Sequence, residues 1–270
     1  MAKIELDKYY TPPELAKELI DLTYEVIGED NITSVLEPSA GSGSFSLQIP
    51  NCEAYDISPC HDSIVEQDYL KLESGYQKGR LIIGNPPFGE KMNLAASFFK
   101  KSVELGDYIA FILPISQLNN TQKLYEFDLI YSRDLGEVYF TDRNIRVCFN
   151  IYRRPENGVP HPRKKSYKLK DIQLAELRGA SSSQKRIDLV NSMDYDIAFC
   201  TWGTIGKKVE KPMTYSKEVF IKVLKDELRE PVVELLSNID WKSHYGMVGT
   251  PNLAQWQIYK ALKENIDGIE

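Results

Sequence analysis

Apolar and polar residues alternate with two different periods over the first part of the chain. Leu15, Leu19 and Leu22 fall on one face of a helical segment whose other face is polar. Short apolar runs, typical of buried strands, then alternate with helical segments. The runs end near residues 37, 57, 69, 83 and 114, and a helix is expected over 94–105. This alternation predicts a parallel sheet with helices packed around it.

The pattern after residue 114 predicts a helix over about 120–131 and two strands near 135–140 and 145–152. A final pair of strands in an otherwise parallel sheet implies an antiparallel edge. We therefore expect an α/β domain with a mostly parallel sheet and an antiparallel edge strand. Farther on, a strand at 195–201 and helices near 216–229 and 252–264 predict a small mixed region.

The most informative stretch follows the apolar run at residues 81–83. Gly84 and two prolines end this run abruptly. Each proline fixes its own φ and moves the preceding residue out of the helical region. The result is a stiff, extended tip that carries Asn85 and Phe88 outward. Because ligands bind at the carboxyl ends of the strands in an open α/β sheet, this tip is the first candidate for a functional site.

The segment before the first helix carries helix-start signals. Thr11 is a candidate N-cap, Pro12 suits the first helical position, and Glu14 completes the spacing of a capping box. Helix-start chemistry alone is therefore an alternative to a functional role for this segment.

A loop of small residues follows the first predicted strand, which ends at Glu37. Gly41 and Gly43 would let a ligand approach the backbone closely, and the loop is expected to lead into a helix. The dinucleotide fingerprint needs a third glycine where Ser46 stands, and the phosphate-loop signature is absent. The loop thus predicts a nucleotide-like ligand without a pyrophosphate.

Two acids stand at successive strand ends. Asp56, fifteen residues after Gly41, could accept hydrogen bonds from two ribose hydroxyls. Asp68 follows the next strand and is placed to accept from an adenine amino group. The alternative is that both acids cap turns, which is a common use of aspartate.

The composition, 42% hydrophobic and 27% charged, is that of an ordinary globular protein. No apolar run is long enough to cross a bilayer, and residues 1–7 lack a signal core, so we expect a cytoplasmic protein without membrane contact. Four scattered cysteines suit reduced thiols. The three histidines are isolated along the chain, so no metal is expected.

Charge is distributed unevenly along the chain. Residues 1–152 hold 13 basic and 23 acidic side chains, whereas residues 153–270 hold 20 basic and 16 acidic ones. Residues 153–165 are basic, proline-rich and aperiodic, which is typical of a linker. We expect a domain over 1–152, a basic linker over 153–165 and a small region over 166–270. A polyanion would be bound mainly by the rear half.

Three motifs together resemble a known family. Tyr10-Thr11-Pro12, the loop from Glu37 to Gly43 and Asn85-Pro86-Pro87-Phe88 follow the order of the S-adenosylmethionine-dependent DNA N6-adenine methyltransferases of restriction–modification type, in their gamma arrangement. The strand Ile145–Tyr152 is similar to a late strand of that family that bears an aromatic residue against the target base. Asn150 stands where family members often carry Gln.

The resemblance covers about residues 9–152 and implies a Rossmann-like class I methyltransferase sheet. Residues 166–270 would then be a small target-recognition region. The implied cofactor is S-adenosylmethionine, and the implied substrate is a flipped-out adenine in duplex DNA, methylated at its N6 amino group. A cognate restriction endonuclease or a specificity protein is a candidate partner. The protein itself would be a monomer or a homodimer.

The resemblance also implies roles for individual residues. Asn85, Pro86, Pro87 and Phe88 would be catalytic, with the Asn85 side-chain oxygen and the Pro86 carbonyl accepting from the adenine amino group. Phe88 and Phe149 would hold the base. The cofactor would contact Tyr10, Thr11, Pro12, Glu37, Ser39, Ala40, Gly41, Gly43, Asp56, Ile57, Asp68, Tyr69 and Asn85. The nucleic-acid backbone would be held by Arg153, Arg154, Arg163, Lys164 and Lys165.

Alternatives of two kinds stay open. The same strand tip occurs in methyltransferases that act on RNA adenine or guanine, or on a protein glutamine. The glutamine enzymes tend to carry Tyr where this chain has Phe88, and they lack a basic C-terminal extension. The other alternative is a catalytically inactive, nucleic-acid-binding relative. The intact sequence Asn85-Pro86-Pro87-Phe88 argues against a loss of activity.

Overall fold

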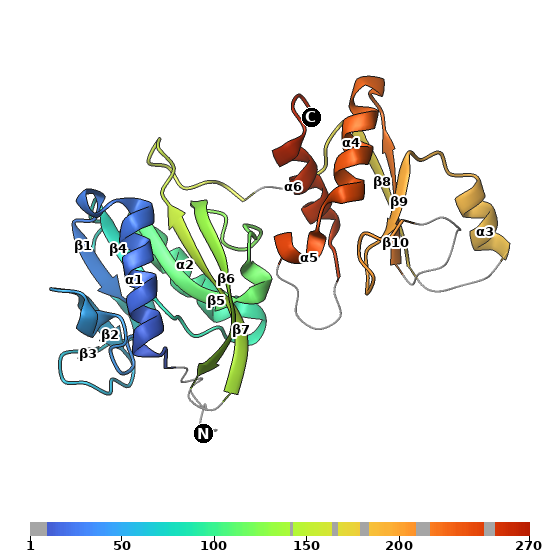
Figure 1. Cartoon of the computed structure of the whole chain (residues 1–270). Helices are drawn as coiled ribbons and strands as arrows, with labels where there is room; N and C mark the ends of the chain where they lie inside the picture. Colours follow the sequence, from blue (N-terminus) through green and yellow to red (C-terminus); the bar gives the residue numbers. More distant parts are fainter. Residues whose placement is uncertain (1–9, 141–142, 164–166, 179–183, 209–216, 246–251) are drawn as a thin grey trace. The chain divides into compact units, whose positions relative to one another are not determined.

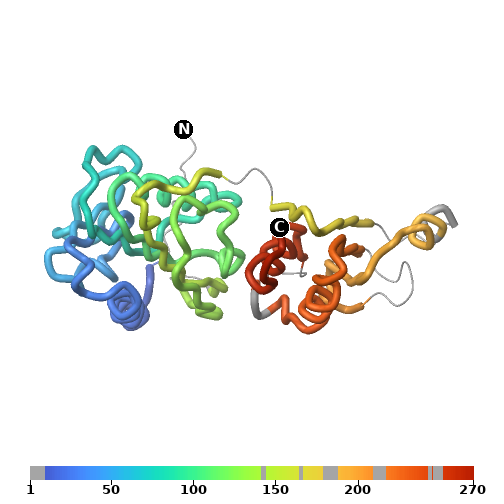
Figure 2. Tube along the Cα trace, turned by 90° about the horizontal axis from the view of Figure 1, so that it is seen from above, coloured from blue at the N-terminus to red at the C-terminus, as the bar shows by residue number. Residues whose placement is uncertain are grey.

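The computed structural model describes residues 10–140, 143–163, 167–178, 184–208, 217–245 and 252–270. The chain forms two compact units, Met1–Arg163 and Lys164–Glu270, each with its own sheet and core (Figures 1 and 2). In the ranges just given, no helix combines the length and the apolar character needed to span a bilayer.

Unit 1 is built on a seven-stranded sheet with the order β3-β2-β1-β4-β5-β7-β6. The strands are β1 (Ser34–Glu37), β2 (Glu53–Asp56), β3 (Val65–Glu66), β4 (Arg80–Gly84), β5 (Tyr108–Pro114), β6 (Asp128–Phe140) and β7 (Arg143–Arg153). β1 to β5 pair in parallel, and β7 is antiparallel to both β5 and β6. This arrangement is the class I methyltransferase sheet and confirms the predicted fold class.

Helices cover both faces of this sheet. They are α1 (Pro13–Ile27) and α2 (Asn93–Leu105), and short 3-10 turns lie at Glu29–Asn31, Ser46–Gln48, Tyr69–Lys71, Glu90–Met92 and Ile115–Gln117. The central strand β4 is buried on both sides, as expected for a parallel strand. Leu81 and Ile83 join the core layer that holds α1, whereas Ile82 joins the layer that holds α2. Alternate side chains of one strand thus tie the two layers together.

The part of unit 1 that follows β5 differs from the sequence-based expectation in two ways. The antiparallel strand is β7, which lies inside the sheet, so the edge strand is β6. The predicted helix over 120–131 is wrong, because β6 begins at Asp128 and the preceding segment is irregular. Asn119 has φ +51°, the Asn120 side chain donates to the Ser116 carbonyl, and its oxygen accepts from the Gln122 N–H. Such local side-chain bonds compete with a helix.

Two expectations near the amino end of the sheet are also wrong. The N-cap of α1 is Pro12, without a side-chain hydrogen bond, so Thr11 is not the cap and Pro13 opens the helix. The small-residue loop does not lead into an α-helix but into the 3-10 turn Ser46–Gln48. The Ser44 hydroxyl donates to the Thr11 carbonyl at 2.7 Å, which ties the loop to the start of α1.

Unit 2 contains a three-stranded antiparallel sheet with the order β8-β10-β9. Its elements are β8 (Ile172–Arg178), α3 (Gln184–Asn191), β9 (Ile197–Cys200), β10 (Lys217–Val223), α4 (Asp226–Asn238), α5 (Trp241–His244) and α6 (Gln255–Asn265). α4 and α6 pack on one face of the sheet, in a core that includes Phe199 and Trp241 (Figure 1). The predicted helix at 216–229 is wrong in its first half, because the alternating apolar residues Val219, Ile221 and Val223 form β10.

Candidate functional site

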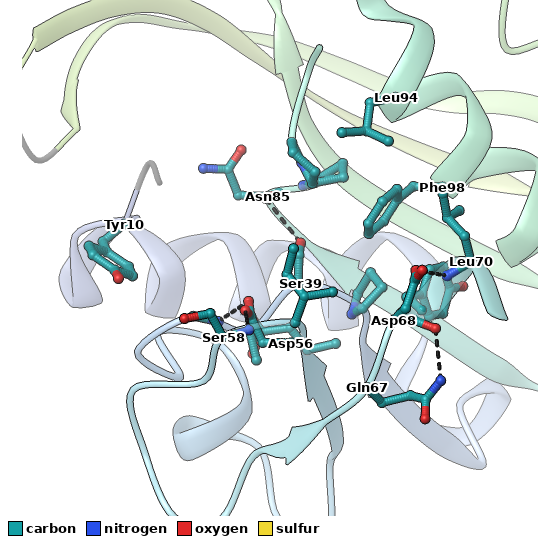
Figure 3. A pocket seen from close by; sticks show the side chains of 18 of the residues that line it. Tyr10, Ser39, Asp56, Ser58, Gln67, Asp68, Leu70, Asn85, Leu94 and Phe98 are labelled. Atoms are coloured by element: carbon teal, nitrogen blue, oxygen red, sulfur yellow. Dashed lines mark hydrogen bonds between the residues drawn. The ribbon is translucent and has the colours of Figure 1, made fainter. Parts of the chain in front are cut away.

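A pocket of about 460 Å³ opens beside the carboxyl ends of β1, β2 and β4 (Figure 3). Its size is within the range of small-molecule sites. The predicted residues that line it are Tyr10, Thr11, Glu37, Ser39, Ala40, Gly41, Asp56, Ile57, Asp68, Tyr69, Asn85, Pro86 and Pro87. The structure therefore brings together five separate segments of the chain, at residues 10–11, 37–41, 56–57, 68–69 and 85–87.

The glycine loop is held in place by Asp56. One carboxylate oxygen accepts from the Gly41 N–H at 2.8 Å, and the other accepts from the Ser58 N–H at 2.7 Å. Gly41 has φ +53°, and a Cβ at this position would lie 2.9 Å from Cε1 of Tyr10. Glycine is therefore needed here both for the backbone conformation and for the close approach of the Tyr10 ring.

The second acid, Asp68, also has a local structural role. Its carboxylate accepts from the Leu70 N–H at 3.0 Å and pairs with Lys71 at 3.1 Å, at the start of a 3-10 turn. Both acids thus cap turns, as the alternative held, and both also line the pocket. Cap bonds leave carboxylate lone pairs for a ligand, because each oxygen can accept more than one hydrogen bond.

Glu37, at the end of β1, is a buried acid on the wall of the pocket. Its carboxylate accepts from the Ser46 N–H at 2.7 Å. Burial raises the pKa of Glu37 to about 8, against a usual value of 4.5. At neutral pH this side chain is therefore mostly protonated, and its neutral form can donate a hydrogen bond as well as accept one.

The tip after β4 places Asn85 at the pocket. The side-chain nitrogen of Asn85 donates to Oγ1 of Thr11 at 3.3 Å. The Asn85 backbone carbonyl accepts from the Ser39 hydroxyl at 3.2 Å (Figure 3). The amide nitrogen thus faces the start of α1, which turns the amide oxygen to the other side. Thr11, wrongly expected to cap the helix, instead orients the amide of Asn85.

Tyr10 covers the glycine loop from outside. Its hydroxyl lies 3.2 Å from Sγ of Cys60, and the Cys60 N–H donates to the Gly41 carbonyl at 2.9 Å. The hydrogen bond with Cys60, together with burial, raises the pKa of Tyr10 to about 12. Tyr10 therefore keeps its proton over the physiological range and acts as a neutral wall of the pocket.

Some predicted residues do not line the pocket. Pro12, Gly43 and Phe88 lie next to lining residues, and Phe88 is half-buried against the core layer that holds α1. Phe149 is fully buried in that same layer, because its position on β7 directs it to the α1 side of the sheet. The expectation that Phe149 contacts a substrate base is corrected accordingly, since its ring faces core side chains.

Sequence reasoning missed several lining residues, namely Pro38, Ser44, Ser58, Gln67, Leu70, Gly89, Leu94 and Phe98. Most of them stand within three residues of a predicted strand end or loop glycine, and that proximity is the signal that could have found them. Phe98 belongs to α2 and packs against Tyr69, with ring centroids 5.3 Å apart. Phe98 lies in the helix predicted over 94–105, and helical spacing alone does not distinguish a core residue from a pocket residue.

The basic residues predicted to hold a nucleic acid differ in their surroundings. Arg154 is used inside unit 1, where its side chain, 13% exposed, pairs with Asp107 at 2.9 Å. The expectation of a phosphate contact is corrected for this residue, since its charge is already neutralised by a carboxylate. The side chain of Arg153 is 46% exposed, and Arg163 is exposed. Lys164 and Lys165 lie outside the described residues.

In the described part of the chain, no group of three or more His, Cys, Asp or Glu side chains is placed to hold a metal ion. Cys148 and Cys200 are buried and Cys52 is half-buried, whereas Cys60 is exposed beside the pocket.

Comparison with known proteins gives one sequence relative and several structures. No family model matches the chain. The type II methyltransferase M.CvrRI of Paramecium bursaria Chlorella virus XZ-6E is 25% identical over 195 residues, a match covering 56% of this chain and 49% of that protein. This chain thus aligns with about half the length of its relative.

The matching structures are distant in sequence. PH1948 from Pyrococcus horikoshii is 18% identical, with a TM-score of 0.45 over 57% of this chain and 90% of that one. A magnesium protoporphyrin IX methyltransferase from Synechocystis PCC 6803, with bound S-adenosylmethionine, is 12% identical, with a TM-score of 0.38 over 52% of this chain and 79% of that one. The fold assignment itself rests on the strand order and the antiparallel β7. The chain has the class I S-adenosylmethionine-dependent methyltransferase fold and is a distant relative of a type II methyltransferase.

Proposed function

We propose that the protein transfers a methyl group from S-adenosylmethionine to the N6 amino group of an adenine in duplex DNA. One observation carries the proposal: Asn85 and Pro86 line the same pocket as the glycine loop and Asp56. A methyl acceptor bound at the tip would therefore face a cofactor bound at the loop. The distant type II methyltransferase supports a nucleic-acid substrate.

The chemistry of the lining residues fits the proposed cofactor. Asp56 and Asp68 offer carboxylate oxygens to the ribose hydroxyls and the adenine amino group of S-adenosylmethionine. Ile57, Leu70 and Phe98 offer apolar surface to its flat adenine ring. The cofactor supplies a methyl group on a positively charged sulfur.

The tip would activate the substrate amino group. The N6 nitrogen of adenine is a poor nucleophile because its lone pair is delocalised into the ring. When Oδ1 of Asn85 and the Pro86 carbonyl accept hydrogen bonds from its two N–H groups, the nitrogen becomes more pyramidal and its lone pair localises. With S-adenosylmethionine bound at the glycine loop, the N–C bond would form as the S–C bond breaks and the sulfur becomes neutral, and the cationic methylated nitrogen would release one proton to the solvent. Positioning and electrostatics carry the rate, without a covalent enzyme intermediate.

The target adenine has to leave the duplex to reach this pocket. Extruding a base costs a few kcal/mol, and stacking on an aromatic side chain returns on the order of 1–3 kcal/mol. Phe88, two residues beyond Pro86, is proposed for that stacking. Arg153, Arg163 and the lysines at 164 and 165 are proposed to contact phosphates, which would make binding depend on salt.

The proposal is tested by incubating the full chain with labelled S-adenosylmethionine and duplex DNA, RNA or protein in parallel. We expect label in duplex DNA, and N6-methyladenine after digestion to nucleosides. Label found only in RNA, or only on a protein glutamine, would contradict the proposal and identify RNA or protein as the methyl acceptor. Cofactor binding without transfer to any acceptor would instead indicate an inactive relative.

A further inference from the structure

Unit 2 presents one exposed tryptophan on a short turn after β9. Trp202 is 46% exposed, whereas Trp241 in the same unit is 2% exposed. Trp202 is the second residue of the segment Thr201–Lys208, which we call the Trp202 loop. A single exposed apolar side chain is ordinary on a protein surface. A functional role for Trp202 therefore depends on the backbone of its loop and on the residues around it.

The backbone of the Trp202 loop is closed by hydrogen bonds. The Gly206 N–H donates to the Cys200 carbonyl at 2.9 Å, and the Cys200 N–H donates to the Lys207 carbonyl at 2.9 Å. The Thr201 carbonyl accepts from the Leu253 N–H at 2.8 Å, which fixes the loop to a second chain segment. None of these bonds uses the Trp202 side chain. A loop fixed in this way loses little conformational entropy when it binds a partner.

The loop is also anchored from below. Gly206 has φ +80°, and a Cβ there would lie 3.1 Å from Cδ1 of Trp241. Trp241 stacks on Phe199, with centroids 5.9 Å apart and an interplanar angle of 17°. The glycine therefore lets the loop rest directly on the aromatic core of unit 2. Buried rings form the base of the loop, and Trp202 projects from its exposed side.

The exposed neighbours of Trp202 within the loop are polar or basic. Thr204, Lys207 and Lys208 are exposed, and the segment Thr201–Lys208 contains no acidic residue. A protein–protein contact would favour a wider apolar surface around the tryptophan. An exposed aromatic ring in a loop that also carries exposed lysines instead fits a nucleic acid, because lysines can contact phosphates while the ring contacts a base or sugar.

We propose that the Trp202 loop is a duplex-DNA contact of unit 2, with Trp202 packing against a base step and Lys207 and Lys208 against the backbone. This role rests on the proposed function, since that function makes duplex DNA the substrate. The loop would add affinity for the substrate and take no part in the transfer step.

The proposal is tested with Trp202→Ala in the full chain. We expect duplex affinity to fall about 5- to 100-fold, as for the loss of one aromatic contact with a base. KM for DNA should rise by a similar factor, with kcat at saturating DNA and cofactor affinity unchanged. Leu224→Ala, which truncates another exposed apolar residue of unit 2, is the matched control and should bind as the wild type does.

Two further measurements separate contact from folding. Trp202→Phe keeps a ring and should keep most of the affinity, but should abolish the tryptophan fluorescence change caused by added duplex. Lys207→Ala and Lys208→Ala should each lower the salt slope of binding by about one.

Wild-type affinity in Trp202→Ala would overturn the inference and leave the proposed function standing. A change in oligomeric state without a change in DNA affinity would overturn it in favour of a protein interface. If the wild type methylates only RNA, the proposed function fails, and the fluorescence titration with duplex still decides whether this loop binds DNA.

Discussion

Replacing Arg154 with Ala should destabilise unit 1 strongly. The guanidinium pairs with Asp107 at 2.9 Å and donates to the Gly106 carbonyl at 2.9 Å. It also lies over the rings of Phe127 and Tyr76, at 4.7 and 5.0 Å from their centroids. One side chain thus joins the end of α2, the start of β5 and the segment that follows β7.

The magnitude follows from what the substitution leaves behind. Removing one partner of a buried ion pair costs about 3–5 kcal/mol, because the other charge loses its compensation. Asp107, 16% exposed, would keep its bonds from the Gly79 N–H at 2.7 Å and the Tyr76 hydroxyl at 2.9 Å. We therefore expect the lower end of the range, about 3 kcal/mol, and a fall in Tm of about 6–12 °C for a unit of this size.

Scanning calorimetry measures this change, and Arg153→Ala is the matched control. The side chain of Arg153 is 46% exposed, and its ion pair with Glu156 is long, at 4.0 Å. Loss of this exposed pair should therefore change the free energy of unfolding by less than about 1 kcal/mol. All three tryptophans are in unit 2, so the fluorescence transition should stay in place. Equal, small shifts for both arginine variants would refute the internal role of Arg154.

Three more predictions concern the pocket. Gly41→Ala should weaken S-adenosylmethionine binding about tenfold in calorimetric titration, because φ +53° and the Tyr10 ring disfavour a Cβ; Gly158→Ala, strained at φ +74° away from the pocket, should bind normally. Burial keeps the pKa of Glu37 near 8, so unfolded chains release this proton from about pH 4.5 upward while folded ones retain it. The free energy of unfolding, measured in urea, should therefore decrease as the pH rises from about 4.5 to about 8. Glu37→Gln should remove this part of the pH dependence. Cys60→Ala and Tyr10→Phe should each weaken cofactor binding a few-fold, with no further loss in the double variant if the contact acts as a unit.

The position of the pocket could be predicted from the sequence because its signals are local. Strand ends at Glu37 and Asp56, small residues between them and prolines after Gly84 each limit the backbone within a few residues. A parallel sheet then brings successive strand ends to one edge. The pattern of the chain predicted only a mostly parallel sheet, whereas the class I arrangement was implied by the family resemblance, and the position of β7 between β5 and β6 was not predicted.

The errors arise where distant contacts decide the outcome. Helical spacing at 120–131 gave way to side-chain bonds of Asn120, and apolar alternation at 217–223 outweighed helix propensity because β8 and β9 flank that strand. Arg154 stands in a segment whose composition is typical of a linker, but its side chain is mostly buried because it pairs with Asp107, forty-seven positions earlier. Phe149 was placed by motif resemblance, which does not fix the face of the sheet; the register with Ile112 does.

The proposed role of Asn85 is to activate an adenine amino group beside the cofactor pocket. It is tested most directly by the single-turnover rate of labelled methyl transfer from bound S-adenosylmethionine to duplex DNA in Asn85→Ala. The rate should fall by about 10²–10³-fold, as when one positioned polar group is removed from a reacting centre, while cofactor affinity stays near that of the wild type. Transfer to adenine at a rate close to that of the wild type would contradict it.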